Sequence, residues 1–192
     1  MRNPHKSLRK IIAMKLFMLA AIAAIVLAGF LTEGSSSDSL KNLTVSYGFN
    51  QFPKEYTCDG MDVSPQIEIS GLSDASNVTS IAMILDDPDA PIGTFTHWVT
   101  WNLMPANVIP GNIPNLMNIT TPIKAMQGTN SAGKIGYMGP CPPPGKPHRY
   151  FLKVYGLDMM LDLKPGSNKS ALENAMNGHV LLQGETMATY GR

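Results

Sequence analysis

The sequence of 192 residues has few charged side chains, only two cysteines and no strong excess of either charge. Charged residues make up 15% of it, and its 15 basic and 14 acidic residues give a formal net charge of +1. Nucleic-acid-binding domains usually carry a basic excess or a basic stripe, so this composition argues against a nucleic-acid partner. The chain also contains no internal repeat. We therefore expect one globular domain with an ordinary hydrophobic core.

The N-terminal segment differs from the rest of the chain. Its first ten residues, MRNPHKSLRK, are basic, and residues 16–31 are apolar without interruption. A basic start followed by an apolar run is typical of a secretory signal, and an uncleaved run of this kind would be a membrane anchor. We expect residues 1–31 to form a hydrophobic helix with one of these two roles. The polar stretch TEGSSSDS, residues 32–39, then serves as a flexible linker, and residues 40–192 form an extracytoplasmic domain that is secreted or anchored.

The two cysteines and four sequons agree with export. Cys58 and Cys141 allow one disulfide, which an oxidising compartment would favour, and two small buried thiols are the alternative. Four N-x-S/T sequons are candidate glycosylation sites: Asn42, Asn77, Asn118 and Asn168.

The apolar pattern of residues 40–192 has a period of two more often than 3.6. This pattern predicts strands over residues 43–49, 66–70, 78–85, 96–103, 149–157 and 179–190. The best helix signal is SNKSALENAMNGH, where Ser170 is the expected N-cap, Leu172 and Met176 are four residues apart, and Gly178 ends the helix. Many strands with one late helix predict a mainly β fold, an antiparallel β-sandwich with one or two short helices.

The stretch DDPDAPIGTFTHW, residues 86–98, follows an apolar strand directly. Asp87 and Asp89 are two residues apart, so in an extended segment their side chains share a face. Pro88 and Pro91 stiffen the segment and hold the carboxylates in place. His97 then opens the next strand. The alternative interpretation is an acidic surface turn followed by a structural histidine.

A second stretch, GYMGPCPPPGKPHRYF in residues 136–151, is a proline-rich loop that leads into a strand. Gly139 would let a backbone N–H approach a ligand closely. His148 and Tyr150 share one face of the strand, whereas Arg149 points the other way and should pair with an acid. The alternative interpretation is a rigid surface turn.

Together the two stretches predict a pocket for a small anion or zwitterion. Two histidines, a tyrosine hydroxyl and a glycine N–H can donate hydrogen bonds to an anion, and nearby aspartates would orient the histidines and favour imidazolium. We favour a binding protein over an enzyme and expect no cofactor and no metal. The alternative is a hydrolase that uses either a metal held by these aspartates and histidines or Cys141 as a nucleophile activated by His148. No H-x-H or H-E-x-x-H spacing supports a metal site, and a disulfide would leave Cys141 without a free thiol to act as the nucleophile.

These motifs resemble those of the phosphatidylethanolamine-binding protein family, which includes the Raf kinase inhibitor proteins, and especially its bacterial and archaeal branch. The stretches YTCDGMDVSPQIEISGL and LENAMNGHVLLQGETMATYGR resemble that branch as well. The resemblance covers residues 40–192 and implies a β-sandwich with a small anion pocket at one end. It implies a pocket shaped by Pro91 and lined by Asp87, Asp89, His97, Gly139, His148 and Tyr150.

The resemblance also implies a function. Family members bind phosphate, acetate or the phosphoethanolamine head group, and several inhibit kinases or proteases, so a kinase or protease is the protein partner to expect. Animal members have an acidic residue and extra aromatic residues just before the pocket histidine, where this chain has only GTFT. The bare anion pocket is therefore the firmer expectation, and inhibition of the animal type is the weaker one.

Overall fold

The computed structural model describes residues 41–192. The expected hydrophobic helix in residues 1–31 and the linker in residues 32–39 lie outside the described residues. Within residues 41–192, no helix is long and apolar enough to cross a membrane. The four sequon asparagines, which remain candidate glycosylation sites, all fall within the described part and are exposed.

The described residues are mainly β structure. They contain one α-helix, α2 (Lys169–Met176), and two single-turn 3-10 helices, η1 (Lys54–Tyr56) and η2 (Leu72–Asp74). The strands are β1 (Lys41–Asn42), β2 (Thr44–Ser46), β3 (Ile67–Ser70), β4 (Ser80–Asp87), β5 (Phe95–Leu103), β6 (Val108–Ile109), β7 (Asn118–Ile119), β8 (Ala125–Gln127), β9 (His148–Leu157) and β10 (Val180–Tyr190).

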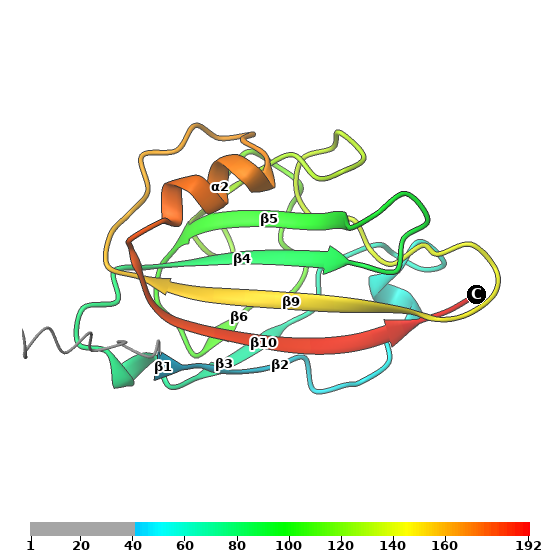
Figure 1. Ribbon diagram of the computed structural model, residues 1–192, viewed down its shortest axis with the longest axis horizontal. Helices are drawn as coiled ribbons and strands as arrows, with labels where there is room; N and C mark the ends of the chain where they lie inside the picture. Colours follow the sequence, from blue (N-terminus) through cyan, green and yellow to red (C-terminus); the bar gives the residue numbers. More distant parts are fainter. Residues whose placement is uncertain (1–40) are drawn as a thin grey trace, which may run out of the picture. The chain divides into compact units, whose positions relative to one another are not determined.

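These strands form two sheets. The seven-stranded sheet has the order β1-β10-β9-β4-β5-β8-β7, and the three-stranded sheet has the order β2-β3-β6. Figure 1 shows the four long strands β5, β4, β9 and β10 side by side in that order, with α2 beside β5. The pairs are antiparallel, as predicted, except that β1 runs parallel to β10. The predicted mainly β fold with antiparallel sheets and one helix is therefore confirmed.

Strand β4 is buried along its whole length, and its residues 81–85 are all apolar because both faces of the strand are covered. Its residues alternate between two hydrophobic clusters. Met83 belongs to the larger cluster, which also contains Ile69 of β3 and Ile109 of β6. Ile84 belongs to the second cluster, which lies on the other face and includes Leu172 of helix α2.

Helix α2 starts two residues earlier than a Ser170 cap requires. The side chain of Asn168 accepts a hydrogen bond from the backbone N–H of Ala171, at 3.0 Å, and so caps the helix. The prediction that Ser170 is the N-cap is therefore wrong, because this residue already lies in the first turn. The rest of the helix prediction is confirmed: Leu172 and Met176 are buried, and Gly178 takes a left-handed conformation, with φ of 82°, just after the helix.

Candidate functional site

Three strand ends meet at one end of the large sheet. Strand β4 is antiparallel to both β5 and β9, so its last residue, Asp87, lies close to the first residues of those two strands. A cavity of about 160 Å³ lies there. Its polar side chains are Asp87, His97, His148 and Tyr150. Residues 90–91, Phe95 and residues 138, 141, 142 and 143 of the proline-rich loop complete its wall, which is mainly apolar.

His148 and Asp87 form a buried pair. Nδ1 of His148 lies 2.8 Å from Oδ2 of Asp87, and the two residues are only 8% and 3% exposed. The other carboxylate oxygen, Oδ1, accepts the backbone N–H of Asp89 at 2.8 Å. Both oxygens of Asp87 are therefore engaged, and the imidazole is held with its Nε2 as the nitrogen available to a ligand. The prediction that an aspartate orients this histidine is confirmed.

His97 is held by a backbone group instead of an aspartate. Its Nδ1 donates to the carbonyl oxygen of Met138 at 2.7 Å, and its ring lies edge-on to the ring of Tyr150, with 5.2 Å between centroids. Burial lowers the pKa of His97, and this effect exceeds the opposing influence of Met138 and of nearby aspartates, including Asp87. The prediction that an aspartate orients His97 is therefore wrong, and burial disfavours the predicted imidazolium form.

The hydroxyl of Tyr150 is a buried group without a partner. Tyr150 is 0% exposed, and its hydroxyl makes no hydrogen bond with any residue in the range 41–192. Burial and the negative charge of Asp87 raise the pKa of Tyr150, so the hydroxyl keeps its proton and remains a donor. Leaving a buried hydroxyl unsatisfied costs about 1–3 kcal/mol. Such a group at a cavity wall indicates a place for a ligand that accepts a hydrogen bond.

Asp89 is not among the residues that line the cavity. It lies in the turn after β4, so the extended geometry that would have placed it beside Asp87 is absent. Its Oδ1 accepts from NH2 of Arg149 at 2.8 Å, and its Oδ2 accepts from Nε of the same guanidinium at 2.9 Å. This pairing lowers the pKa of Asp89. The expectation that Arg149 points outward and pairs with an acid is confirmed.

Gly139 also stands outside the cavity lining. Its N–H, which was expected to face a ligand, donates to Oδ1 of Asp62 at 2.6 Å. A side chain at this position would collide with the carbonyl oxygen of Tyr56, so the glycine permits a close packing of two loops. The sequence offers no signal for this pairing, because Asp62 lies 77 residues away.

Cys58 and Cys141 form a disulfide, which confirms the first of the two predicted alternatives, a bridge or two buried thiols. No free cysteine exists among residues 41–192. The hypothesis of a Cys141 nucleophile is therefore wrong, because its sulfur is already bonded. The bridge ties the proline-rich loop, which forms a cavity wall, to the segment after η1, where the N–H of Cys58 also donates to the carbonyl oxygen of Pro140 at 3.2 Å.

The sequence model of the phosphatidylethanolamine-binding proteins matches residues 45–191. The chain belongs to this family. A UPF0098 protein of Pyrococcus horikoshii is 47% identical over 183 residues, which cover 93% of this chain and 91% of that protein. A UPF0098 protein of Methanothermobacter thermautotrophicus is 41% identical over 151 residues, which cover 77% of this chain and 97% of that protein.

Solved structures show the same fold. The crystal structure of a phosphatidylethanolamine-binding protein homologue from Chlamydia trachomatis matches with a TM-score of 0.69 at 35% identity, covering 80% of this chain and 99% of that chain. YbcL of E. coli matches with a TM-score of 0.69 at 26% identity, covering 78% of this chain and 98% of that chain. The resemblance to the phosphatidylethanolamine-binding protein family is therefore confirmed.

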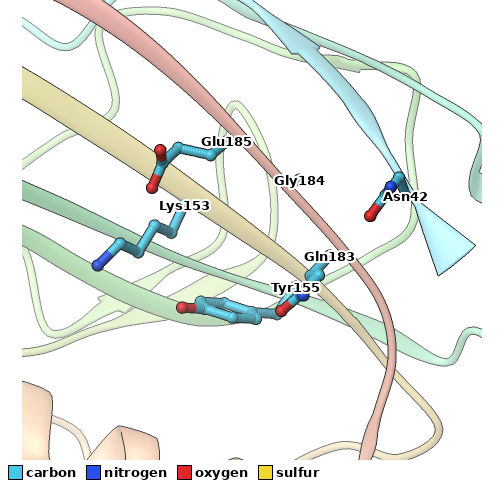
Figure 2. Close-up of a pocket in the computed structure, with 6 residues that line it drawn as sticks. All are labelled: Asn42, Lys153, Tyr155, Gln183, Gly184 and Glu185. Atoms are coloured by element: carbon cyan, nitrogen blue, oxygen red, sulfur yellow. The ribbon is translucent and has the colours of Figure 1, made fainter. Parts of the chain in front are cut away.

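This family member also has a larger hollow on the outer face of β9 and β10 (Figure 2). The hollow measures about 370 Å³ and is lined by Asn42, Lys153, Tyr155, Gln183, Gly184 and Glu185. Figure 2 shows the side chains of Lys153, Tyr155 and Glu185 on one side of the two strands. None of the residues predicted to bind a ligand lies there.

The structure brings together five of the residues that the sequence predicts for the pocket. They are Asp87, Pro91, His97, His148 and Tyr150. Sequence reasoning assigned no role to Met138, whose contribution includes a backbone carbonyl that no side-chain pattern could indicate. It missed Phe95, whose ring lies 4.8 Å from that of His97. Among residues 41–192, no group of three or more His, Cys, Asp or Glu side chains is arranged to hold a metal ion.

Proposed function

We propose that the protein is an exported binding protein that holds a small anion in the cavity, either phosphate, a carboxylate or a phosphoethanolamine-type head group. The observation that carries this proposal is the hydroxyl of Tyr150, which is buried at the cavity wall without a hydrogen-bond partner in the described chain. A bound anion would accept from this hydroxyl and offset the cost of burying it.

The remaining groups of the cavity fit the same ligand. His148 is held by Asp87 through Nδ1, so its Nε2 is the nitrogen that can meet an anion, and it donates when the ring carries both protons. Burial lowers the pKa of His97 and so favours the neutral ring, whose Nδ1 donates to Met138 and whose Nε2 carries a lone pair. A protonated phosphate oxygen can donate to that lone pair, or the anion can raise the pKa of His97 until the ring takes up a proton.

The size of the cavity limits the ligand. Pockets for drug-sized molecules usually measure about 300–1,000 Å³, and this cavity measures about 160 Å³. A phosphate or carboxylate group fits inside, and the rest of a larger ligand must extend past the mouth. The mouth is bordered by the turn after β4, where Ile92 is 95% exposed. One exposed apolar side chain is not a patch, so inhibition of a kinase or protease remains part of the proposal only through membership of the family.

Export is inferred from chemistry as well as from the N-terminal sequence. Disulfides persist in oxidising compartments, and Cys58 and Cys141 are joined. Intracellular proteins of hyperthermophiles are the known exception to this rule. Determining the N-terminus of the protein after expression with its leader, in membrane and secreted fractions, tests the inference. Recovery of the intact chain from the cytoplasm alone would contradict it.

We also infer that the two sheets are the layers of a β-sandwich. One buried cluster contains Val45 of β2, Ile67 of β3 and Ile109 of β6 together with Leu152 of β9. A shared core of this kind is expected where two sheets pack face to face.

Calorimetric titration of inorganic phosphate and of phosphoethanolamine into the protein tests the proposed function. We expect binding in the parent and its loss in His148→Ala and in Asp87→Asn, because each change removes one half of the buried pair. Glu185→Gln, in the hollow of Figure 2, is the matched control and should bind as the parent does. The proposal would be contradicted if both cavity variants bound the ligands with the affinity of the parent, or if the folded parent did not bind them.

A further inference from the structure

A second hollow lies on the other side of His148. It measures about 270 Å³ and is lined by Asp89, Pro143, Pro144, Lys146, Pro147 and His148. His148 and Pro143 line the cavity as well, so the two spaces share part of one wall. A ligand whose anion contacts His148 could therefore reach this outer hollow with a neighbouring group.

The charged groups of the outer hollow are not balanced. The carboxylate of Asp89 is neutralised by Arg149, which donates to both of its oxygens. Lys146 makes no ion pair with any residue in the range 41–192. The uncompensated charge of the outer hollow is therefore the single positive charge of Lys146.

The loop that carries Lys146 is held in a fixed course. Pro144 and Pro147 flank it closely, and the intervening Gly145 donates its N–H to the carbonyl oxygen of Arg192 at 3.3 Å. Gly145 has a φ of 144°, a conformation that glycine adopts readily. A stiff loop loses less backbone entropy when a ligand binds, so the main conformational cost is that of ordering the lysine side chain.

We propose that the outer hollow is a second subsite, which takes the carboxylate of a ligand whose phosphate occupies the cavity. This proposal rests on the proposed function and names its ligand class: a small phosphate ester with a carboxylate a few atoms away, as in O-phosphoserine. Lys146 is then the residue that determines specificity. The ammonium group of phosphoethanolamine would instead meet a lysine, and both oxygens of Asp87 and of Asp89 already accept hydrogen bonds.

The test compares O-phospho-L-serine with phosphoethanolamine by calorimetry. We expect the parent to bind phosphoserine about two- to fivefold more tightly, which is the range for one exposed ion pair. Lys146→Met should abolish this preference and leave the affinity for phosphoethanolamine within twofold of the parent value, and Lys146→Arg should retain the preference. Lys124→Met is the matched control, because Lys124 is also exposed and has no ion pair among residues 41–192.

The outcomes separate this proposal from the function on which it rests. The second subsite is overturned if the parent binds both ligands equally, or if Lys146→Met lowers the affinity for both ligands equally. Neither outcome contradicts the proposed anion cavity. Absence of binding for both ligands overturns the two together. Glycerophosphoserine distinguishes the sources of the ligand: binding equal to that of phosphoserine indicates a lipid head group, and much weaker binding indicates a free monoester.

Discussion

Strand β9 contributes side chains to both the cavity and the hollow of Figure 2, and the two regions use them differently. His148 and Tyr150 point to the cavity side and are buried. Lys153 and Tyr155 point to the opposite side and are partly exposed. Because side chains alternate along a strand, one segment supplies a closed site on one face and an open one on the other.

The difference shows why volume alone is a poor guide to a binding site. The hollow is larger, at about 370 Å³, than the cavity, at about 160 Å³. In the hollow, Lys153 lies opposite Glu185 in the strand register and pairs with Asp86 at 3.5 Å, so its charge already has a partner. In the cavity, Tyr150 has a buried hydroxyl without a hydrogen-bond partner among residues 41–192. Within this range, Tyr47 and Trp101 also have buried donors without a partner, but neither residue lines the cavity or the hollow. The combination of a cavity and an unpartnered donor therefore marks the candidate site better than size does.

Removing the disulfide should have the largest effect and should act on the cavity. The bridge closes a segment of 83 residues, so Cys58→Ser with Cys141→Ser should lower the free energy of unfolding by about 4 kcal/mol. Chemical denaturation measures this loss. Because the bridge holds the cavity wall, hydrogen exchange should rise in residues 136–147 and change little in β9 and β10, which keep their ladder of backbone bonds. Equal acceleration in both regions would show that the bridge stabilises the domain without a special role in the cavity.

Tyr150→Phe should separate ligand binding from stability. Without the hydroxyl, affinity for phosphate should fall about ten- to hundredfold, the value of one hydrogen bond to a charged group. The free energy of unfolding of the free protein should not fall, because the group removed has no partner within residues 41–192. Tyr155→Phe is the matched change in the hollow of Figure 2 and should affect neither quantity. Loss of stability with unchanged affinity in Tyr150→Phe would assign the hydroxyl a structural role.

The pH dependence of stability should report on His97. In the folded protein, burial lowers the pKa of His97 below its ordinary value of 6.5. Between the lowered pKa and pH 6.5, the imidazole of His97 therefore binds more protons in the unfolded chain than in the folded protein. The free energy of unfolding should therefore decrease as the pH falls from 6.5 towards the lowered pKa, and a bound anion should reduce this decrease. Urea denaturation between pH 7.5 and 5.5, with and without phosphate, measures both effects.

His97→Gln should remove this component of the slope, because glutamine can still donate to Met138 and does not titrate. His179→Gln is the control, since His179 is partly exposed and pairs with Asp158, which follows β9 at the opposite end of that strand from His148. A slope that persists in His97→Gln would locate the titrating group elsewhere.

The elements that the sequence predicts well are those with enough residues to show a period. Strands β4, β5, β9 and β10 have eight to eleven residues each; burial alternates along most of β9, whereas β4 and β5 are buried on both faces. Strands β6 and β7 have two residues each, which is too short for any period, and the sequence of this region predicts only a long connection. The parallel pairing of β1 with β10 likewise depends on a two-residue strand.

The residues of the candidate site also differ in how well the sequence predicts them. His148 and Tyr150 could be predicted because strand alternation decides which way they point, and Asp87 because it ends an apolar strand. The position of Asp89 could not be predicted, because Asp89 lies in a turn that directs its side chain towards Arg149. The partner of Gly139 is an aspartate 77 residues away, and the partner of His97 is a backbone carbonyl, so neither leaves a local pattern.

Charge removal in the hollow of Figure 2 should have the smallest effect. Lys153→Met leaves Asp86 with the ammonium of Lys169 at 2.7 Å and the hydroxyl of Thr96 at 2.8 Å, so its buried charge keeps its nearest partners. The free energy of unfolding should change by less than about 1 kcal/mol, the value of an exposed ion pair. Phosphate affinity, measured by calorimetry, should stay within twofold of the parent. A loss of affinity as large as that of Tyr150→Phe would mean that the two faces of β9 are coupled, and the contrast between a closed binding cavity and an open satisfied hollow would no longer hold.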